Sequence, residues 1–314
     1  MNDPSSYYAG AERPSLCWEL TICQSLAGPA SPHGAALRRP APYGRLLAEF
    51  LAARVGLAPS WSVVELGGGY GSLMKAFLET VPLGDVTLVD VSPTFTAAQR
   101  QALGEGPGRR FVTADAFEFL RELSEPVDLV IANEVLGDLP TVTDLPREAL
   151  EEALHHDPPG PLGEVARRVR RYGLDLADAP ERFHFNLGAL QLLEALAPRA
   201  RVVFLSEHGA DTVLPKRYAF LPLPPGDGYP RRIPLKGHDE YTIRFAHLVR
   251  AAGVLGYQVH RIHMAELVGL RDDPGLQAMA RTRTTATETA EVVHEFCEHV
   301  AEYQCLVLVA EGTL

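Results

Sequence analysis

The sequence predicts an α/β protein built on a doubly wound, mostly parallel seven-stranded sheet, with an N-terminal arm and a helical insertion. Short apolar segments alternate with helical segments between residues 62 and 132, which is the pattern of βαβ units. The first apolar segment runs directly into a cluster of glycines. The last two apolar segments come late in the chain, which is consistent with six strands of a nucleotide-binding sheet and a seventh, antiparallel strand.

The elements follow one another in a regular order. A helix is expected over residues 44–55, where apolar residues recur at helical spacing. Strands are expected at 62–66, 86–89, 110–113, 128–132, 201–206, 257–262 and 305–310. Further helices are expected at 72–80, 93–103, 117–123, 241–252 and 284–301. The order of the strands within the sheet stays open at this point.

Two regions interrupt this alternation. Prolines punctuate residues 139–187 and 211–237, which we interpret as insertions within a main domain that spans 44–314. Residues 1–43 are rich in Pro, Gly and Ser and are interpreted as an arm or cap that folds over this domain.

Composition and charge exclude several classes of protein. The formal net charge of the 314 residues is -11, which argues against a nucleic-acid substrate. No apolar run reaches the roughly 18 residues that a membrane span needs. The four cysteines lack a CxxC spacing, so no metal site is expected, and the polar N-terminus does not read as a signal peptide. We expect a cytoplasmic protein without a membrane partner, and a homodimer remains open.

Ligands of doubly wound sheets bind at the carboxyl ends of the strands, so we consider the side chains that stand there. They are Glu65, Gly67, Gly68, Gly69 and Gly71 after the first strand, Asp90 after the second, Asp115 and Ala116 after the third, Asn133 and Glu134 after the fourth, and Glu207 and His208 after the fifth. Glycines allow a ligand to lie against the backbone at the start of the following helix.

These residue types indicate a nucleoside cofactor. Asp90 follows the glycine loop by about 20 residues, the usual position of a carboxylate that binds a ribose diol. Asp115 suits an adenine amino group, or it caps the following helix, and both roles are compatible. Glu65 would repel a pyrophosphate, and Ser72 stands where a dinucleotide fingerprint has glycine or alanine. A carboxylate here favours the ammonium and sulfonium of S-adenosylmethionine over NAD(P).

Three segments in order resemble the first motifs of class I methyltransferases: Val63–Gly71, Leu88–Asp90 and Ala114–Ala116. The resemblance implies a Rossmann-like methyltransferase sheet. Ala132–Pro140 is similar to the Asn-Glu-x-x-Asp-x-Leu-Pro segment of the MidA-like family, which includes a mitochondrial complex I assembly arginine methyltransferase. Asp138 stands one place later than the aspartate of that family, and Gly137 takes its position. Pro42–Leu47 and Tyr241–Phe245 also resemble segments of that family.

The sequence therefore predicts a methyltransferase that acts on an N or O acceptor, either a small molecule or a protein side chain such as arginine. Glu134, Asp138, Glu207 and His208 are the candidate catalytic residues, because a base is needed where the acceptor is protonated. An NAD(P)-dependent oxidoreductase and a non-catalytic, cofactor-binding assembly protein are the two alternatives.

Overall fold

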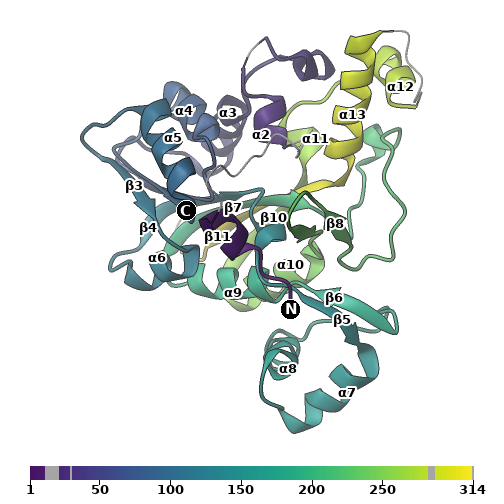
Figure 1. The fold of residues 1–314 in the computed structure, drawn as a ribbon. Helices are drawn as coiled ribbons and strands as arrows, with labels where there is room; N and C mark the ends of the chain where they lie inside the picture. The colour runs from purple at the N-terminus through teal and green to yellow at the C-terminus, as the bar shows by residue number, and fades with distance from the viewer. Residues whose placement is uncertain (11–20, 29, 282–286, 313–314) are drawn as a thin grey trace.

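A seven-stranded sheet forms the centre of the protein in the computed structural model, which describes residues 1–10, 21–28, 30–281 and 287–312 (Figure 1). The spatial order is β10-β11-β7-β4-β1-β2-β3. The strands are β1 (Ser62–Leu66), β2 (Asp85–Asp90), β3 (Arg109–Thr113), β4 (Val127–Asn133), β7 (Ala200–His208), β10 (Tyr257–His263) and β11 (Tyr303–Ala310). The pairs of this sheet are parallel except those of β11, which is antiparallel to β7 and β10. The predicted sheet is confirmed.

Helices cover both faces of the sheet, as Figure 1 shows. One layer contains α3 (Tyr43–Val55), α4 (Ser72–Thr80), α5 (Pro93–Leu103), α11 (Met264–Leu267), α12 (Pro274–Arg281) and α13 (Glu288–Glu302). The other contains α6 (Ala116–Glu122), α9 (Leu187–Leu196) and α10 (Phe245–Val254). The apolar spacing of α3 explains its position, because Leu46, Leu47, Leu51 and Val55 are all buried against the core. Each such side chain stabilises the fold by about 1.5–3 kcal/mol.

One helix prediction was wrong in extent, and one helix was missed. The helix expected from residue 241 begins at Phe245, because Tyr241 pairs in a short strand and Thr242 is held by Arg231. The Thr242 N–H donates to the Arg231 carbonyl at 3.0 Å, and the Arg231 N–H donates to Thr242 Oγ1 at 2.9 Å. Helix α9 was not predicted, since its nearly continuous apolar sequence has no helical periodicity. The expected start of the last helix, at 284–286, lies outside the described residues.

The region 139–187 forms a small helical lobe. It contains β5 (Val142–Pro146), α7 (Arg147–His156), α8 (Pro161–Tyr172) and β6 (Arg182–Phe185), and β5 pairs with β6. Figure 1 shows α7 and α8 projecting beyond the α9–α10 layer. The region 211–237 contains the turn η4 (Lys216–Tyr218) and β8 (Arg232–Pro234), which pairs with β9 (Asp239–Tyr241).

The described parts of the N-terminal arm lie over the carboxyl ends of the parallel strands. They comprise α1 (Ser5–Gly10), α2 (Ile22–Ser25) and η2 (Pro32–Ala36). Asn2 forms a β-bridge with Thr141, and Ile22 belongs to the core shared with α3. The arm therefore contributes both to the core and to the surroundings of the strand ends.

Candidate functional site

A cavity of about 530 Å³ opens at the carboxyl ends of β1, β2, β4 and β7. From β1 the chain adds β2 and β3 on one side of the sheet, and it then crosses to add β4 and β7 on the other side. The switch point therefore lies between β1 and β4, and doubly wound sheets bind their ligands at such a point. All the site residues predicted from the sequence line this cavity except Gly71. Its wall also contains residues that the sequence did not indicate, namely Tyr8, Arg231, Glu240, Glu295, His299, Glu302 and Tyr303.

The glycine loop between β1 and α4 depends on backbone conformations that favour glycine. Gly67, Gly69 and Gly71 have φ values of 66°, 49° and 78°. A Cβ on Gly67 would lie 2.4 Å from Val135 Cγ2. Gly71 precedes α4 as its N-cap and supports the loop from outside the cavity. The loop thus presents bare backbone to a ligand.

Glu65 stands beneath this loop as a buried carboxyl group. Its side chain is 3% exposed, and Oε2 has no hydrogen-bond partner among the described residues. Burial and the nearby charge of Asp90 raise the pKa of Glu65 to about 8. An orphaned carboxylate oxygen facing a cavity fits a ligand cation such as the ammonium group of S-adenosylmethionine.

Asp90 closes the loop from the end of β2. The Gly69 N–H donates to Asp90 Oδ2 at 3.1 Å, and the Ser92 N–H donates to Oδ1 at 2.9 Å. Burial raises the pKa of Asp90 to about 6, against these two donors and Gln99. The amide of Gln99 also donates to the Gly69 carbonyl at 3.0 Å. The carboxylate and the loop are therefore held as one unit at the expected ribose position.

Hydrogen bonds within the protein fix two further predicted residues, Asp115 and Asn133. Asp115 caps α6, since its Oδ1 accepts from the N–H groups of Phe117 and Glu118 at 2.9 and 3.2 Å. Asn133 Oδ1 accepts from the hydroxyls of Tyr43 at 2.8 Å and Ser206 at 2.6 Å. Because only the amide oxygen can accept, these hydroxyls fix the orientation of the Asn133 amide. Ala116 lies beside Asp115 on the cavity wall.

Glu134 follows β4 in a strained conformation. Its φ of 57° is in the left-handed region that non-glycine residues rarely adopt, at a cost of about 1–3 kcal/mol. Oε1 accepts from the Ile22 N–H at 2.7 Å, and the Tyr303 hydroxyl also bonds to the carboxyl group. Burial first, and then the charge of Glu207, raise the pKa of Glu134 to about 8.

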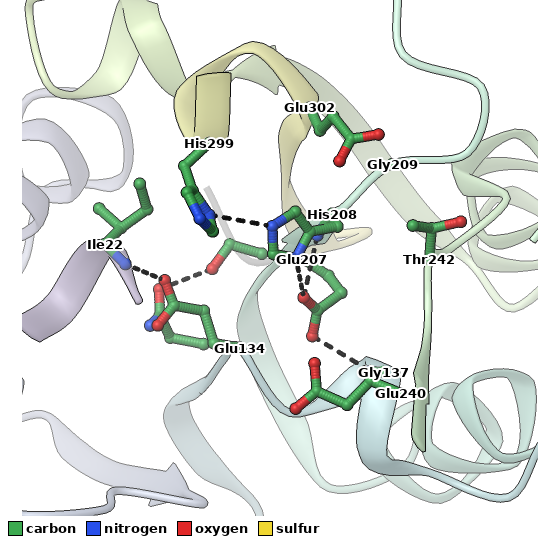
Figure 2. Close-up of polar contacts among 12 residues, drawn as sticks. Ile22, Glu134, Gly137, Glu207, His208, Gly209, Glu240, Thr242, His299 and Glu302 are labelled. Atoms are coloured by element: carbon green, nitrogen blue, oxygen red, sulfur yellow. Dashed lines mark hydrogen bonds and ion pairs between the residues drawn. The ribbon is translucent and has the colours of Figure 1, made fainter. Parts of the chain in front are cut away.

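Glu207 and His208 form an ion pair at the end of β7 (Figure 2). Glu207 Oε1 lies 3.4 Å from His208 Nδ1, and Oε2 accepts from the Gly137 N–H at 3.1 Å. His208 Nε2 lies 3.4 Å from His299 Nδ1. Burial lowers the pKa of His208, but Glu207 outweighs it and raises that pKa overall. Burial and the charge of His208 lower the pKa of His299 to about 4.

Asp138 belongs to a second charge cluster that includes two residues of the β8–β9 hairpin region. His238 Nε2 lies 3.6 Å from Asp138 Oδ1 and 3.7 Å from Glu240 Oε1. Burial opposes the charge on His238, yet the two carboxylates raise its pKa to about 10. Burial, followed by the charge of Asp138, raises the pKa of Glu240 to about 7. The arm joins this cluster through the Tyr8 hydroxyl, which lies 2.9 Å from His238 Nε2.

The carboxyl groups of the cavity thus fall into two groups, those with a cationic side chain as partner and those without one. Asp138 and Glu240 share His238, Glu207 pairs with His208, and Glu302 pairs with Arg231. In the part of the chain that the structure describes, no cationic side chain forms an ion pair with Glu65 or with Glu134. Asp90 is held by backbone donors instead. The cavity therefore offers two carboxyl groups, Glu65 and Glu134, to the cationic groups of a ligand.

The fold and the site have features of class I methyltransferase domains, a class that takes its methyl group from S-adenosylmethionine. These features are the antiparallel β11, the glycine loop after β1 and Asp90 after β2. Residues 64–160 match the family described as a methyltransferase domain. Glu65 and the bare backbone of the loop fit the cofactor of that class.

Two curated relatives match part of the chain. A 4-amino-L-phenylalanine/4-methylamino-L-phenylalanine methyltransferase from Streptomyces pristinaespiralis is 33% identical over 148 residues, which are 47% of this chain and 44% of that protein. A trans-aconitate 2-methyltransferase from Methylobacterium nodulans is 34% identical over 165 residues, 51% of this chain and 58% of that protein. The chain spans about half the length of these relatives.

Among solved structures, an uncharacterized protein from Burkholderia thailandensis has the same fold. Its TM-score is 0.54 at 16% identity, over 97% of this chain and 92% of that protein. In the described parts of the chain, no helix is both long and apolar enough to cross a membrane.

Cofactor affinity is expected to depend on pH through Glu65. A ligand cation binds the ionised carboxylate, whereas a pKa of about 8 leaves most Glu65 protonated at pH 7. Binding therefore releases a proton, and affinity falls as pH decreases, by up to about tenfold per unit below pH 7. Calorimetry of S-adenosylmethionine between pH 6.5 and 8.5, in buffers of different ionisation enthalpy, measures both effects. Glu65→Gln should bind weakly and without this pH dependence, and an unchanged pH profile would contradict the role of Glu65.

Proposed function

We propose that this protein transfers the methyl group of S-adenosylmethionine to a nitrogen atom of an acceptor that is cationic in solution, such as an amine or a guanidine. The observation that supports this most directly is Glu134. It is a half-buried carboxyl group at the cavity wall, held in a strained backbone conformation, and it forms no ion pair with a cationic side chain of the described residues. Strain of this kind persists where the surrounding structure enforces it, often at functional sites.

Glu134 has two tasks in this reaction. Its carboxylate binds the acceptor ammonium group, and then takes one proton from that nitrogen, so that the nitrogen lone pair becomes free. A pKa of about 8 suits a base that works near neutral pH. The Ile22 N–H and the Tyr303 hydroxyl keep the carboxyl group in place.

The cofactor supplies an electrophilic methyl group: the C–N bond forms as the C–S bond breaks, and the electron pair of that bond stays on sulfur. The residues of the chain contribute mainly by alignment. Glu65 would hold the ammonium group of the cofactor and Asp90 its ribose, while Asn133 and Glu134 follow one another at the end of β4. Alignment of this kind can supply a large part of the rate enhancement of a displacement reaction.

The charge of the cavity favours one of the two relatives' substrates over the other. One relative is named for 4-amino-L-phenylalanine, which carries amino groups, and the other for trans-aconitate, a polyanion. Polyanion binding would be unfavourable beside Glu134, Asp138, Glu207 and Glu240. The similarity of Ala132–Pro140 to the MidA-like family supports a protein arginine among the acceptors. Neither an oxidoreductase nor a purely cofactor-binding partner protein accounts for a strained Glu134 at the cavity wall.

The test compares acceptors of opposite charge. Release of S-adenosylhomocysteine is measured with a panel of alkylamines, guanidines and 4-amino-L-phenylalanine, and with trans-aconitate at the same concentrations. Turnover is expected with a nitrogen acceptor and not with trans-aconitate. Turnover with the carboxylic acid alone would contradict the proposal.

A further inference from the structure

A second cavity of about 470 Å³ adjoins the first. It is formed by the turn after β7 at residues 209–212, the loop at 223–229 and Thr242. Arg231 and Glu302 line both cavities. In Figure 2, Gly209, Thr242 and Glu302 lie on the side of His208 that is opposite Glu134. The two cavities are therefore neighbours that share one wall.

The shared wall is an ion pair that can open at low cost. Arg231 and Glu302 contact one another directly, and their side chains are 43% and 12% exposed. Because the Arg231 side chain is exposed, water screens this ion pair and reduces its contribution to stability. The Arg231 backbone stays fixed by Thr242, so the side chain alone needs to move.

The first cavity has little room beyond the cofactor. Cavities for one drug-sized ligand measure about 300–1,000 Å³, so a nucleoside cofactor occupies much of the available 530 Å³. What remains, at Glu134 and Glu207, is the space of a reactive head group. The rest of a larger acceptor then lies outside the first cavity, and the second cavity adjoins it.

The charged groups of the second cavity are engaged within the protein. Asp211 accepts from the backbone N–H groups of Phe245 and Ala246 and pairs with Arg261. Asp227 accepts from the Tyr229 N–H. What these groups leave for a ligand is mostly backbone and the apolar surface of Leu223, Pro224 and Pro225, which complements a neutral, amide-bearing group rather than an ionic one.

We propose that the second cavity binds the amide-bearing body of an extended acceptor, while a flexible chain carries the reactive amine past Arg231 and Glu302 to Glu134. This inference rests on the proposed function for the position of the nitrogen. It adds a subsite that makes a chain-borne amine a better acceptor than the same amine free in solution.

Gly226→Phe tests the subsite without disturbing the first cavity. A Cβ on Gly226 would meet no atom closer than the Ala210 carbonyl oxygen at 3.8 Å, so a side chain can enter the cavity. Gly106→Phe is the matched control, because Gly106 also has free space around it and lines neither cavity. The probes are Nα-acetyl-L-lysine N-methylamide and n-butylamine, titrated by calorimetry into protein saturated with S-adenosylhomocysteine.

The wild type is expected to bind the lysine derivative at least tenfold more tightly than n-butylamine. Gly226→Phe should remove this difference and leave the affinities for n-butylamine and S-adenosylhomocysteine unchanged, while Gly106→Phe should change nothing. Equal affinities in the wild type, no binding of the lysine derivative, or no effect of Gly226→Phe would each overturn the subsite. Glu134→Gln separates the two proposals, since it should weaken both probes, and unchanged affinities there would count against the proposed function.

Discussion

Glu134→Gln is expected to lower turnover by about 100-fold or more and to leave the affinity for S-adenosylmethionine nearly unchanged. Glutamine keeps the side-chain shape and can still accept the hydrogen bond from the Ile22 N–H. It lacks the charge that binds a cationic acceptor and the basicity that removes its proton, and a positioned base contributes about 100-fold or more. Calorimetry for affinity and S-adenosylhomocysteine release for turnover are measured on one preparation.

The effects of Glu134→Gln on turnover and on cofactor affinity, taken together, identify the role of Glu134. Glu118→Gln, on the exposed surface of α6, is the control for a change of charge and should behave as the wild type. If Glu134→Gln lost cofactor affinity first, Glu134 would belong to the cofactor site. Unchanged turnover would remove Glu134 from the mechanism and leave Asp138 or the Glu207–His208 pair as the groups that act on the acceptor.

Gly67→Val is expected to abolish cofactor binding, with at least a 100-fold loss of affinity. Gly67 has a φ of 66° and lies against Val135, so a valine side chain must displace Val135 or the loop itself. Either movement changes the backbone surface that the cofactor contacts. The strain of about 1–3 kcal/mol is smaller than the usual stability of a domain, so the protein should remain folded.

The control for this variant is Gly106→Val, at a glycine with free space around it. Thermal unfolding shows whether each variant is folded, and calorimetry then gives the affinity. A folded Gly67→Val protein with the affinity of the wild type would refute the placement of the cofactor on the loop.

Much of the fold was predictable because the sheet is regular. Parallel strands buried on both faces appear as short apolar runs, and the glycines after β1 mark the first strand end. Burial also explains why helix α9 was missed. A helix that is buried on most sides has no polar face, so its sequence shows no helical period. The β8–β9 hairpin has strands of three residues each, too short to give a pattern.

The site was predictable only where its residues stand at strand ends. Glu65, Asp90, Asn133 and Glu134 have such positions, and the structure brings them to one cavity. His238, Glu240 and His299 come from a hairpin and from the helix before the last strand, so no local spacing identified them. Their importance arises from contacts across the fold, such as that between His299 and His208. The arm was predicted as a cap, but its contacts through Tyr8 and Ile22 had no signal in the sequence.

The most direct test of the account follows the methyl group itself. S-adenosylmethionine labelled with ¹³C at the methyl carbon is incubated with the protein and the acceptor panel, and the label is followed by NMR. The account predicts that the signal moves from the sulfonium to an N-methyl position, with one S-adenosylhomocysteine formed for each methyl group transferred, and that Glu134→Gln slows this transfer. A label found on oxygen, or a cofactor that binds to the loop while its methyl group stays on sulfur with every nitrogen acceptor, would contradict it.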